Sequence, residues 1–306
     1  MTAALETDHL SRRYGRTEAV RDLTLSVPEG SVFAFVGPNG AGKTTTIKTV
    51  MNLLRPSAGR ASALGKDSRT LGPTEFRQIG YVSENQDLPA WMTVRQILAF
   101  VKPLYPSWDD AFAASLVRQF DLPLGRPLKA LSRGMRMKAA LLASLAYRPR
   151  LLIMDEPFAG LDALVRDELI HGVLELTAQQ HWTVFISSHD IDEVERLADW
   201  IGIINEGRLY LCEPVASLLA RFRQFEVTVD GLASLPAPLP ASWMLAEATA
   251  HIVRFVDSAF DGQAEHRVRA VWPNATNVSA SPLSLRNIFI TLARTWRLAN
   301  PAKEAL

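Results

Sequence analysis

A glycine-rich loop between an apolar run and a helical pattern constrains this chain more than any other segment. The apolar run is Val32–Val36, and the helical pattern extends from Thr44 to Leu54. This order of buried strand, glycine turn and helix start is the context in which a loop binds phosphate, because glycines let backbone N–H groups surround the phosphate oxygens. We therefore predict that the loop residues bind a nucleotide; they are Gly37, Pro38, Asn39, Gly40, Ala41, Gly42, Lys43, Thr44 and Thr45.

Two side chains of this loop have the chemistry that a nucleoside triphosphate requires. Lys43 supplies a positive charge for the outer phosphates, and the Thr44 hydroxyl is a ligand for Mg²⁺. The helix that begins beside them adds partial positive charge from its N-terminus. The predicted cofactors are therefore ATP and Mg²⁺.

Continuous apolar runs predict the core. Besides Val32–Val36 they are Leu151–Met154, Val184–Ile186 and Ile201–Ile204. Strands buried on both faces read as unbroken runs, and helical patterns separate these, so we predict an α/β fold with a mostly parallel sheet. Residues 19–27 alternate instead, which predicts half-exposed strands near the N-terminus.

The pattern changes twice along the chain. Helical patterns dominate from about residue 88 to 150, which predicts a helical subdomain, and Asn205–Arg208 predicts a hairpin turn. After about residue 220 the chain has a Pro-rich connector, Leu235–Pro240, and a C-terminal amphipathic helix. Short strands are predicted there at Phe225–Val229, Ile252–Val256 and Val268–Val271. We expect a nucleotide-binding domain over 1–220 and a small α+β lobe over 221–306.

Two acidic residues follow the apolar run that ends at Met154. Asp155 is predicted to hold Mg²⁺ through water, and Glu156 to orient or deprotonate the attacking water. Both would lie at the carboxyl edge of the sheet, where α/β folds bind ligands. The alternative is a helix-start Asp-Glu pair with Pro157 in the first turn, which is weaker beside an intact phosphate loop.

His189 follows the apolar run Val184–Ile186 closely and is expected at the same edge. A single histidine after a strand is more often structural than catalytic. Its position beside the two acids reverses that preference, because a neutral imidazole can hydrogen-bond the γ-phosphate. We predict Glu156 and His189 as the catalytic residues.

The segment Leu131–Met135 has two interpretations. Ser132 is a good N-cap, and apolar residues continue behind it, so the segment is at least a helix start. A helix start is also an anion site, because its N–H groups and dipole face outward. Beside a phosphate loop, this segment separates the chain from other nucleotide-binding proteins.

Bulk properties exclude several classes of protein. The net charge of +1 gives no reason to expect a nucleic-acid partner. The single cysteine, Cys212, rules out an internal disulfide and fits a reducing compartment. The apolar stretch Ala139–Ala146 is shorter than the roughly 20 residues of a spanning helix. Met1–Glu6 lacks the apolar core of a signal peptide. We expect a soluble chain unless another subunit holds it at a membrane.

The ordered motifs from Leu5 to Leu219 resemble the ATP-binding subunit of an ATP-binding-cassette (ABC) transporter, in a bacterial, exporter-like branch. Leu131–Met135 stands where this family has its LSGGQ signature, and Ala159–Asp162 resembles its D-loop. The resemblance implies a P-loop NTPase cassette that hydrolyses ATP to power transport.

The resemblance also implies roles and partners. Tyr14 would stack on adenine, and Asp162 would lie across a dimer interface. Ser132 and Gly134 would cap the γ-phosphate held by a second ATP-binding subunit, in a homodimer or a heterodimer. An integral membrane permease would hold the protein peripherally at the cytoplasmic face of the inner (plasma) membrane.

The chain departs from the family pattern at two places. Arg133 and Met135 replace Gly and Gln of the signature, a change compatible with capping by its other residues. The glutamine expected after the strand at 79–82 is displaced, because Glu84 stands at its position and Gln86 follows. Either residue is a candidate for nucleotide and Mg²⁺ binding.

Two further alternatives stay open at this point. A soluble ABC ATPase acting on ribosomes or nucleic acid would resemble this core, but such proteins typically carry two cassettes or a long coiled-coil insertion. Trp91 lies in Leu88–Met92, the family's docking region for the permease. It is either an exposed interface anchor or a buried residue of the helical subdomain.

Overall fold

The structure is a computed structural model that describes residues 2–84, 86, 88–180 and 182–299. It divides into two compact units, Met1–Cys212 and Glu213–Leu306. The division between the units lies before helix α8 (Val215–Arg221), whereas the sequence analysis places the domain boundary near residue 220, at the end of that helix.

A six-stranded sheet forms the centre of the first unit, in the order β10-β9-β3-β8-β7-β6. The five strands from β9 to β6 pair in parallel, as the unbroken apolar runs predict. A turn at Glu206 and Gly207, both with positive φ, connects β9 to β10. The strands are β3 (Val32–Val36), β6 (Ile79–Ser83), β7 (Leu151–Asp155), β8 (Thr183–Ser188), β9 (Trp200–Asn205) and β10 (Arg208–Pro214).

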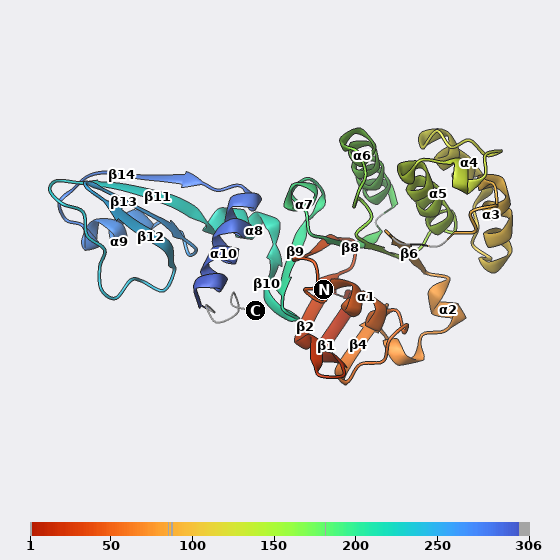
Figure 1. Cartoon of the computed structure of the whole chain (residues 1–306), viewed down its shortest axis with the longest axis horizontal. Coiled ribbons are helices and arrows are strands. Elements are labelled where there is room, and N and C mark those ends of the chain that lie inside the picture. The colour runs from red at the N-terminus through yellow and green to blue at the C-terminus, as the bar shows by residue number, and fades with distance from the viewer. Residues whose placement is uncertain (1, 85, 87, 181, 300–306) are drawn as a thin grey trace. The chain divides into compact units, whose positions relative to one another are not determined.

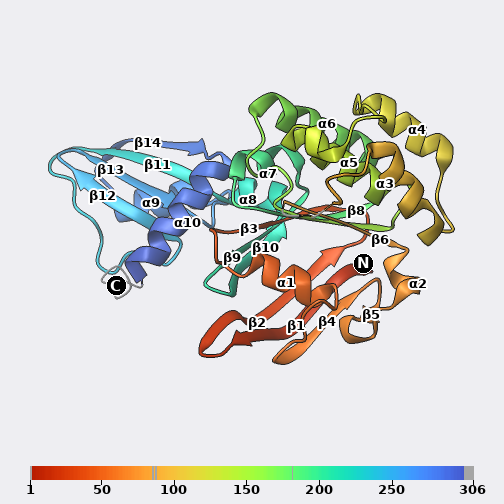
Figure 2. The same ribbon diagram turned by 45° about the vertical axis from the view of Figure 1, so that its right-hand side comes forward.

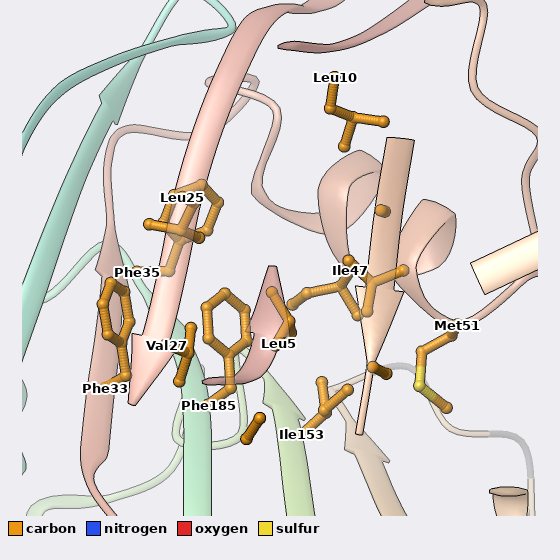
Figure 3. Close-up of a cluster of buried hydrophobic side chains, with 14 of the residues drawn as sticks. Leu5, Leu10, Leu25, Val27, Phe33, Phe35, Ile47, Met51, Ile153 and Phe185 are labelled. Carbon is orange, nitrogen blue, oxygen red and sulfur yellow. The ribbon is translucent and has the colours of Figure 1, made fainter. Parts of the chain in front are cut away.

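A second, antiparallel sheet has the order β2-β1-β4-β5. Together with helix α1 it covers one face of the central sheet (Figure 2), and its alternating strands bury one side. Phe33 and Phe35 are two apart on β3, so both point into this layer, where they pack beside Phe185 (Figure 3). The elements are β1 (Ala3–Tyr14), β2 (Thr17–Pro28), β4 (Ala58–Ala63), β5 (Lys66–Asp67) and α1 (Lys43–Val50).

The remaining helices of the first unit include α5, α6 and α7, which lie on the opposite side of the central sheet from α1 (Figures 1 and 2). Thr93 caps α3 through the predicted capping box, accepting a hydrogen bond from the backbone of Gln96. The helices are α2 (Pro73–Phe76), α3 (Val94–Val101), α4 (Asp110–Gln119), α5 (Arg133–Leu145), α6 (Ala163–Gln180) and α7 (Ile191–Leu197), with short 3₁₀ turns at Ser68–Thr70, Lys102–Leu104 and Leu128–Ala130.

The second unit has an antiparallel sheet of order β12-β13-β11-β14, together with helices α8, α9 and α10. Aromatic rings cluster in its core: the ring centroid of Trp243 lies 4.1 Å from that of Phe255 and 5.4 Å from that of Trp272. The Pro-rich connector is a loop inside this unit, between β11 and β12. The elements after α8 are β11 (Arg223–Val229), β12 (Trp243–Thr249), β13 (Ile252–Asp257), α9 (Ala264–Val271), β14 (Ala275–Pro282) and α10 (Leu285–Ala299).

One predicted strand of this unit is wrong. Residues 268–271 form the last part of helix α9 rather than a strand. Ala264 and Val268 are buried one helical turn apart, so the apolar residues follow a helical period that begins before the segment considered. The strands predicted at 225–229 and 252–256 and the C-terminal amphipathic helix are confirmed as β11, β13 and α10.

Candidate nucleotide-binding and catalytic site

The phosphate loop connects β3 to α1, as the sequence predicts. Two of its glycines are required by close backbone neighbours. A Cβ on Gly37 would lie 2.1 Å from the carbonyl oxygen of Ile204, and a Cβ on Gly42, whose φ is 107°, would lie 2.4 Å from that of Ala19. The turn after β9 also holds the loop, since the N–H of Gly207 donates to the carbonyl of Ala41 at 2.9 Å. The loop is thus fixed against two neighbouring strands.

Lys43 begins α1 and is almost fully buried, with 5% of its side chain exposed. Its ammonium group donates to the carbonyls of Gly37 and Pro38 at 2.5 and 3.1 Å. It also lies 3.0 Å from a carboxylate oxygen of Glu156. A buried ammonium needs such partners, and they place its charge inside the curl of the loop.

Thr44 and Asp155 meet beside this lysine. The Thr44 hydroxyl donates to Oδ1 of Asp155 at 3.1 Å, and the Ser187 hydroxyl donates to the same oxygen at 2.7 Å. These are the oxygen ligands that Mg²⁺ uses, with one or two carboxylates and the remaining positions left to water and phosphate. The described residues hold no group of three or more His, Cys, Asp and Glu side chains arranged to bind a metal.

Glu156 and His189 stand at the ends of two neighbouring parallel strands, β7 and β8. His189 Nδ1 lies 2.7 Å from a carboxylate oxygen of Glu156, within hydrogen-bonding distance. The backbone of Glu156 has a φ of 52°, an unfavourable conformation for this residue type, and its N–H donates to the Ser187 carbonyl at 3.2 Å. Backbone strain of this kind is found at active sites, where it aims a side chain. The structure therefore brings together Lys43, Thr44, Asp155, Glu156 and His189.

A buried network behind His189 escaped the sequence analysis. The Ser188 hydroxyl donates to Glu193 at 2.7 Å, and Arg166 lies 3.4 Å from Glu193 and 3.1 Å from Asp190. Burial raises the pKa of Glu193, an effect that Ser188 and Arg166 oppose and Asp190 adds to. Asp190 is the N-cap of α7, and Glu193 is the third residue of that helix. This spacing is typical of a helix start, and it could have drawn attention to these residues in the sequence.

The signature segment begins α5. Ser132 is the N-cap and accepts a hydrogen bond from the Met135 N–H at 3.2 Å. A Cβ on Gly134 would lie 2.3 Å from Cγ1 of Val165, so this glycine lets α5 approach α6 closely. Within the described residues, no hydrogen bond or ion pair connects Ser132 or Gly134 to the phosphate loop. Their predicted role on a nucleotide stays a prediction.

Within the described residues, no hydrogen bond or ion pair connects Tyr14 or Asp162 to Lys43. Tyr14 ends β1 with 44% of its surface exposed, and the guanidinium of Arg12 lies 4.7 Å from its ring centroid. Asp162 accepts a hydrogen bond from the N–H of Val165 at 3.0 Å, near the start of α6. Their assignment to adenine and to a dimer interface remains a prediction.

Glu84 and Gln86 have different partners. The Glu84 carboxylate lies 2.5 Å from the guanidinium of Arg133, and its backbone N–H donates to the Asp155 carbonyl at 3.0 Å. The Gln86 side chain turns back on its own loop and accepts from the Ser83 N–H at 3.4 Å. Glu84 is thus the one that connects the end of β7 to another segment, the start of α5. Trp91 is 68% exposed, so the alternative that it is buried is wrong.

Comparisons with known proteins point to one family. Residues 20–159 match the ABC transporter family. A carnitine transport ATP-binding protein of Listeria monocytogenes is 35% identical over 67% of this chain. This chain spans about half of that protein's length, because the match covers 54% of it. A bacitracin transport ATP-binding protein of Bacillus licheniformis is 31% identical, and the match covers 74% of each chain.

The fold comparison leads to the same family. A solved ATP-binding subunit of an ABC transporter aligns with a TM-score of 0.64 at 30% identity, over 72% of this chain and 92% of the other. None of the helices in the described residues is both long and apolar enough to cross a membrane. The predicted α/β cassette fold is confirmed, and this chain is a member of the ABC transporter family.

Proposed function

We propose that this chain is the ATP-hydrolysing subunit of a transporter. The observation that carries the proposal is the contact of Lys43 with Glu156 and of Glu156 with His189, at 3.0 and 2.7 Å. In this arrangement Lys43 holds the outer phosphates, Glu156 orients and deprotonates the attacking water, and His189 hydrogen-bonds the γ-phosphate. Thr44 and Asp155 would hold Mg²⁺, which neutralises phosphate charge when bound.

Substitution of the catalytic carboxylate tests the reaction. Glu156→Gln keeps the size of the side chain but cannot take a proton, so turnover should fall by about 10²–10⁴ while ATP binding persists. Lys43→Ala is the contrasting control, because it removes the buried charge of the loop and should weaken binding itself. Steady-state hydrolysis and equilibrium binding of ATP measure the two effects. A wild-type rate for Glu156→Gln would refute the assignment of the base.

We further propose that two ATP-binding subunits pair head to tail, with Ser132 and Gly134 of one capping the ATP of the other. Support comes from their position in the first turn of α5, where Ser132 is exposed and the helix N-terminus has a partial positive charge suited to an anion. Because ATP would contact both subunits, it binds the dimer better than the monomer and shifts that equilibrium.

Light scattering tests this pairing. The Glu156→Gln protein should dimerise with ATP and Mg²⁺ and dissociate with ADP. Adding Ser132→Arg should abolish the dimer, because a bulky cation replaces the capping hydroxyl. A monomer under every nucleotide condition would exclude the homodimer and leave a heterodimer with a second cassette.

A membrane permease is the proposed third component, at the cytoplasmic face of the inner (plasma) membrane. Exposed Trp91 in the segment 88–92 suits an interface anchor. Export is the proposed direction of transport, and it rests on the resemblance of the ordered motifs to an exporter-like branch of the family. When the tagged protein is purified from cells, an integral membrane protein should be recovered with the wild type. Less of that membrane protein should be recovered with Trp91→Ala. Recovery with ribosomes in place of membranes would favour the soluble alternative.

A further inference from the structure

Two departures from the family pattern meet in one ion pair. Arg133 stands where the signature has glycine, and Glu84 stands where a glutamine is expected. Nη2 of Arg133 lies 2.5 Å from Oε1 of Glu84, and their side chains are 43% and 33% exposed. Each departure therefore supplies the partner of the other.

The position of Arg133 explains why it needs an anion. It is the first residue of α5, where the helix dipole disfavours a positive charge. No acidic residue stands in the first turn of this helix to offset that charge. The Glu84 carboxylate, from the segment after β6, brings the missing negative charge to the helix start.

The same guanidinium reaches a third segment. A Cβ on Gly160 would lie 2.4 Å from Nη1 of Arg133, so the arginine fills the space over this glycine between β7 and α6. Glu84 in turn is fixed to β7, because its N–H donates to the Asp155 carbonyl at 3.0 Å. The ion pair thus connects the start of the signature helix to the end of β7.

We propose that the Glu84–Arg133 pair is a positioning device that sets where the signature segment lies relative to the carboxyl end of β7. It would control how well Ser132 and Gly134 meet the ATP of a second subunit. The inference rests on the proposed function, because the signature acts on a nucleotide only in that arrangement.

A double-mutant cycle tests the pair through Glu84→Gln, Arg133→Gln and their combination. Glu84→Gln leaves the Arg133 cation without its carboxylate at a helix start, and Arg133→Gln leaves the Glu84 carboxylate without its cation. Each change should lower kcat about fivefold, and the combination also about fivefold rather than the roughly 25-fold of independent effects. Within the part of the chain that the structure describes, no hydrogen bond or ion pair joins either side chain to the phosphate loop. Affinity of the isolated subunit for AMP-PNP with Mg²⁺ should therefore stay within about twofold.

A second ion pair on the same helix provides the matched control. Lys138 lies 2.6 Å from Glu168 and connects α5 to α6. The control variants are Lys138→Gln, Glu168→Gln and their combination. They remove the same charges as the test variants but leave Glu84 and Arg133 unchanged. Their kcat values should remain within about twofold of wild type.

Failure of the positioning role can be distinguished from failure of the proposed function. Independent effects of the two substitutions on kcat, or a wild-type kcat for Glu84→Gln, would overturn the positioning role. Equal losses of kcat in the control set would also overturn it, because any charge change on α5 would then suffice. If Arg133→Gln fails to fold, Arg133→Lys replaces it and should retain more activity than Glu84→Gln. A wild-type protein that does not hydrolyse ATP would instead refute the proposed function.

Discussion

Burial of the Glu193 side chain makes the free energy of unfolding of the protein depend on pH. Because burial raises its pKa above 4.5, the folded state keeps this proton at pH values where the unfolded state loses it. Stability from this group is therefore fully present below about pH 4.5 and is lost as pH rises through the higher, folded pKa. Glu193→Gln imitates the protonated form, and Arg166 keeps Asp190 as a partner at 3.1 Å.

Thermal melts of wild type and Glu193→Gln from pH 4 to 8 measure this effect. The melting temperature of the variant should exceed that of wild type most at the alkaline end, and the two should converge toward pH 4. A difference that stays constant with pH would mean that Glu193 is ionised throughout.

A single residue's role could be predicted from the sequence when the residues that define the role are neighbours in the chain. The phosphate loop and the acids after β7 could be placed from the sequence, because each follows a buried strand and parallel strands end at one edge. The partners of Glu84 and Glu193 could not, since Arg133 and Arg166 come from helices far along the chain. Only folding brings such pairs together.

At the scale of elements, Gly134 controls how closely α5 packs on α6. A Cβ on this residue would meet Val165 Cγ1 at 2.3 Å and its Cβ at 3.3 Å. Gly134→Ala should therefore destabilise the protein by about 1–3 kcal/mol, the usual scale of overpacking. Val165→Ala removes both methyl groups, so the double variant should recover most of the loss in urea unfolding. If Gly134→Ala is as stable as wild type, the helices are less tightly packed than described.

Helices and strands could be predicted from the sequence where their apolar residues form a long, regular pattern. The unbroken runs of β3 and β7 identify a parallel sheet, and Thr93 with Gln96 marks the start of α3. Residues 268–271 are too short to distinguish a strand from the last turn of a helix. The decisive apolar neighbour, Ala264, lies outside the segment that suggested a strand.

At the scale of the whole molecule, the residues assigned to ATP chemistry all belong to the first unit, Met1–Cys212. The second unit has its own sheet and its own aromatic core around Trp243 and Phe255, so neither unit depends on the other for a core. A chain that ends after Pro214 keeps β10 intact and removes the second unit. It should bind AMP-PNP within about tenfold of the full chain, or about 1.4 kcal/mol.

The truncated protein must first melt cooperatively, since a lost fold would also abolish binding. Lys43→Ala in the same truncated chain is the matched control and should bind much more weakly, because the loop charge is gone. A loss beyond about tenfold in a folded truncated protein would mean that the second unit helps to build the nucleotide site. Retained affinity would instead assign the second unit, with its separate core, to a task other than holding ATP.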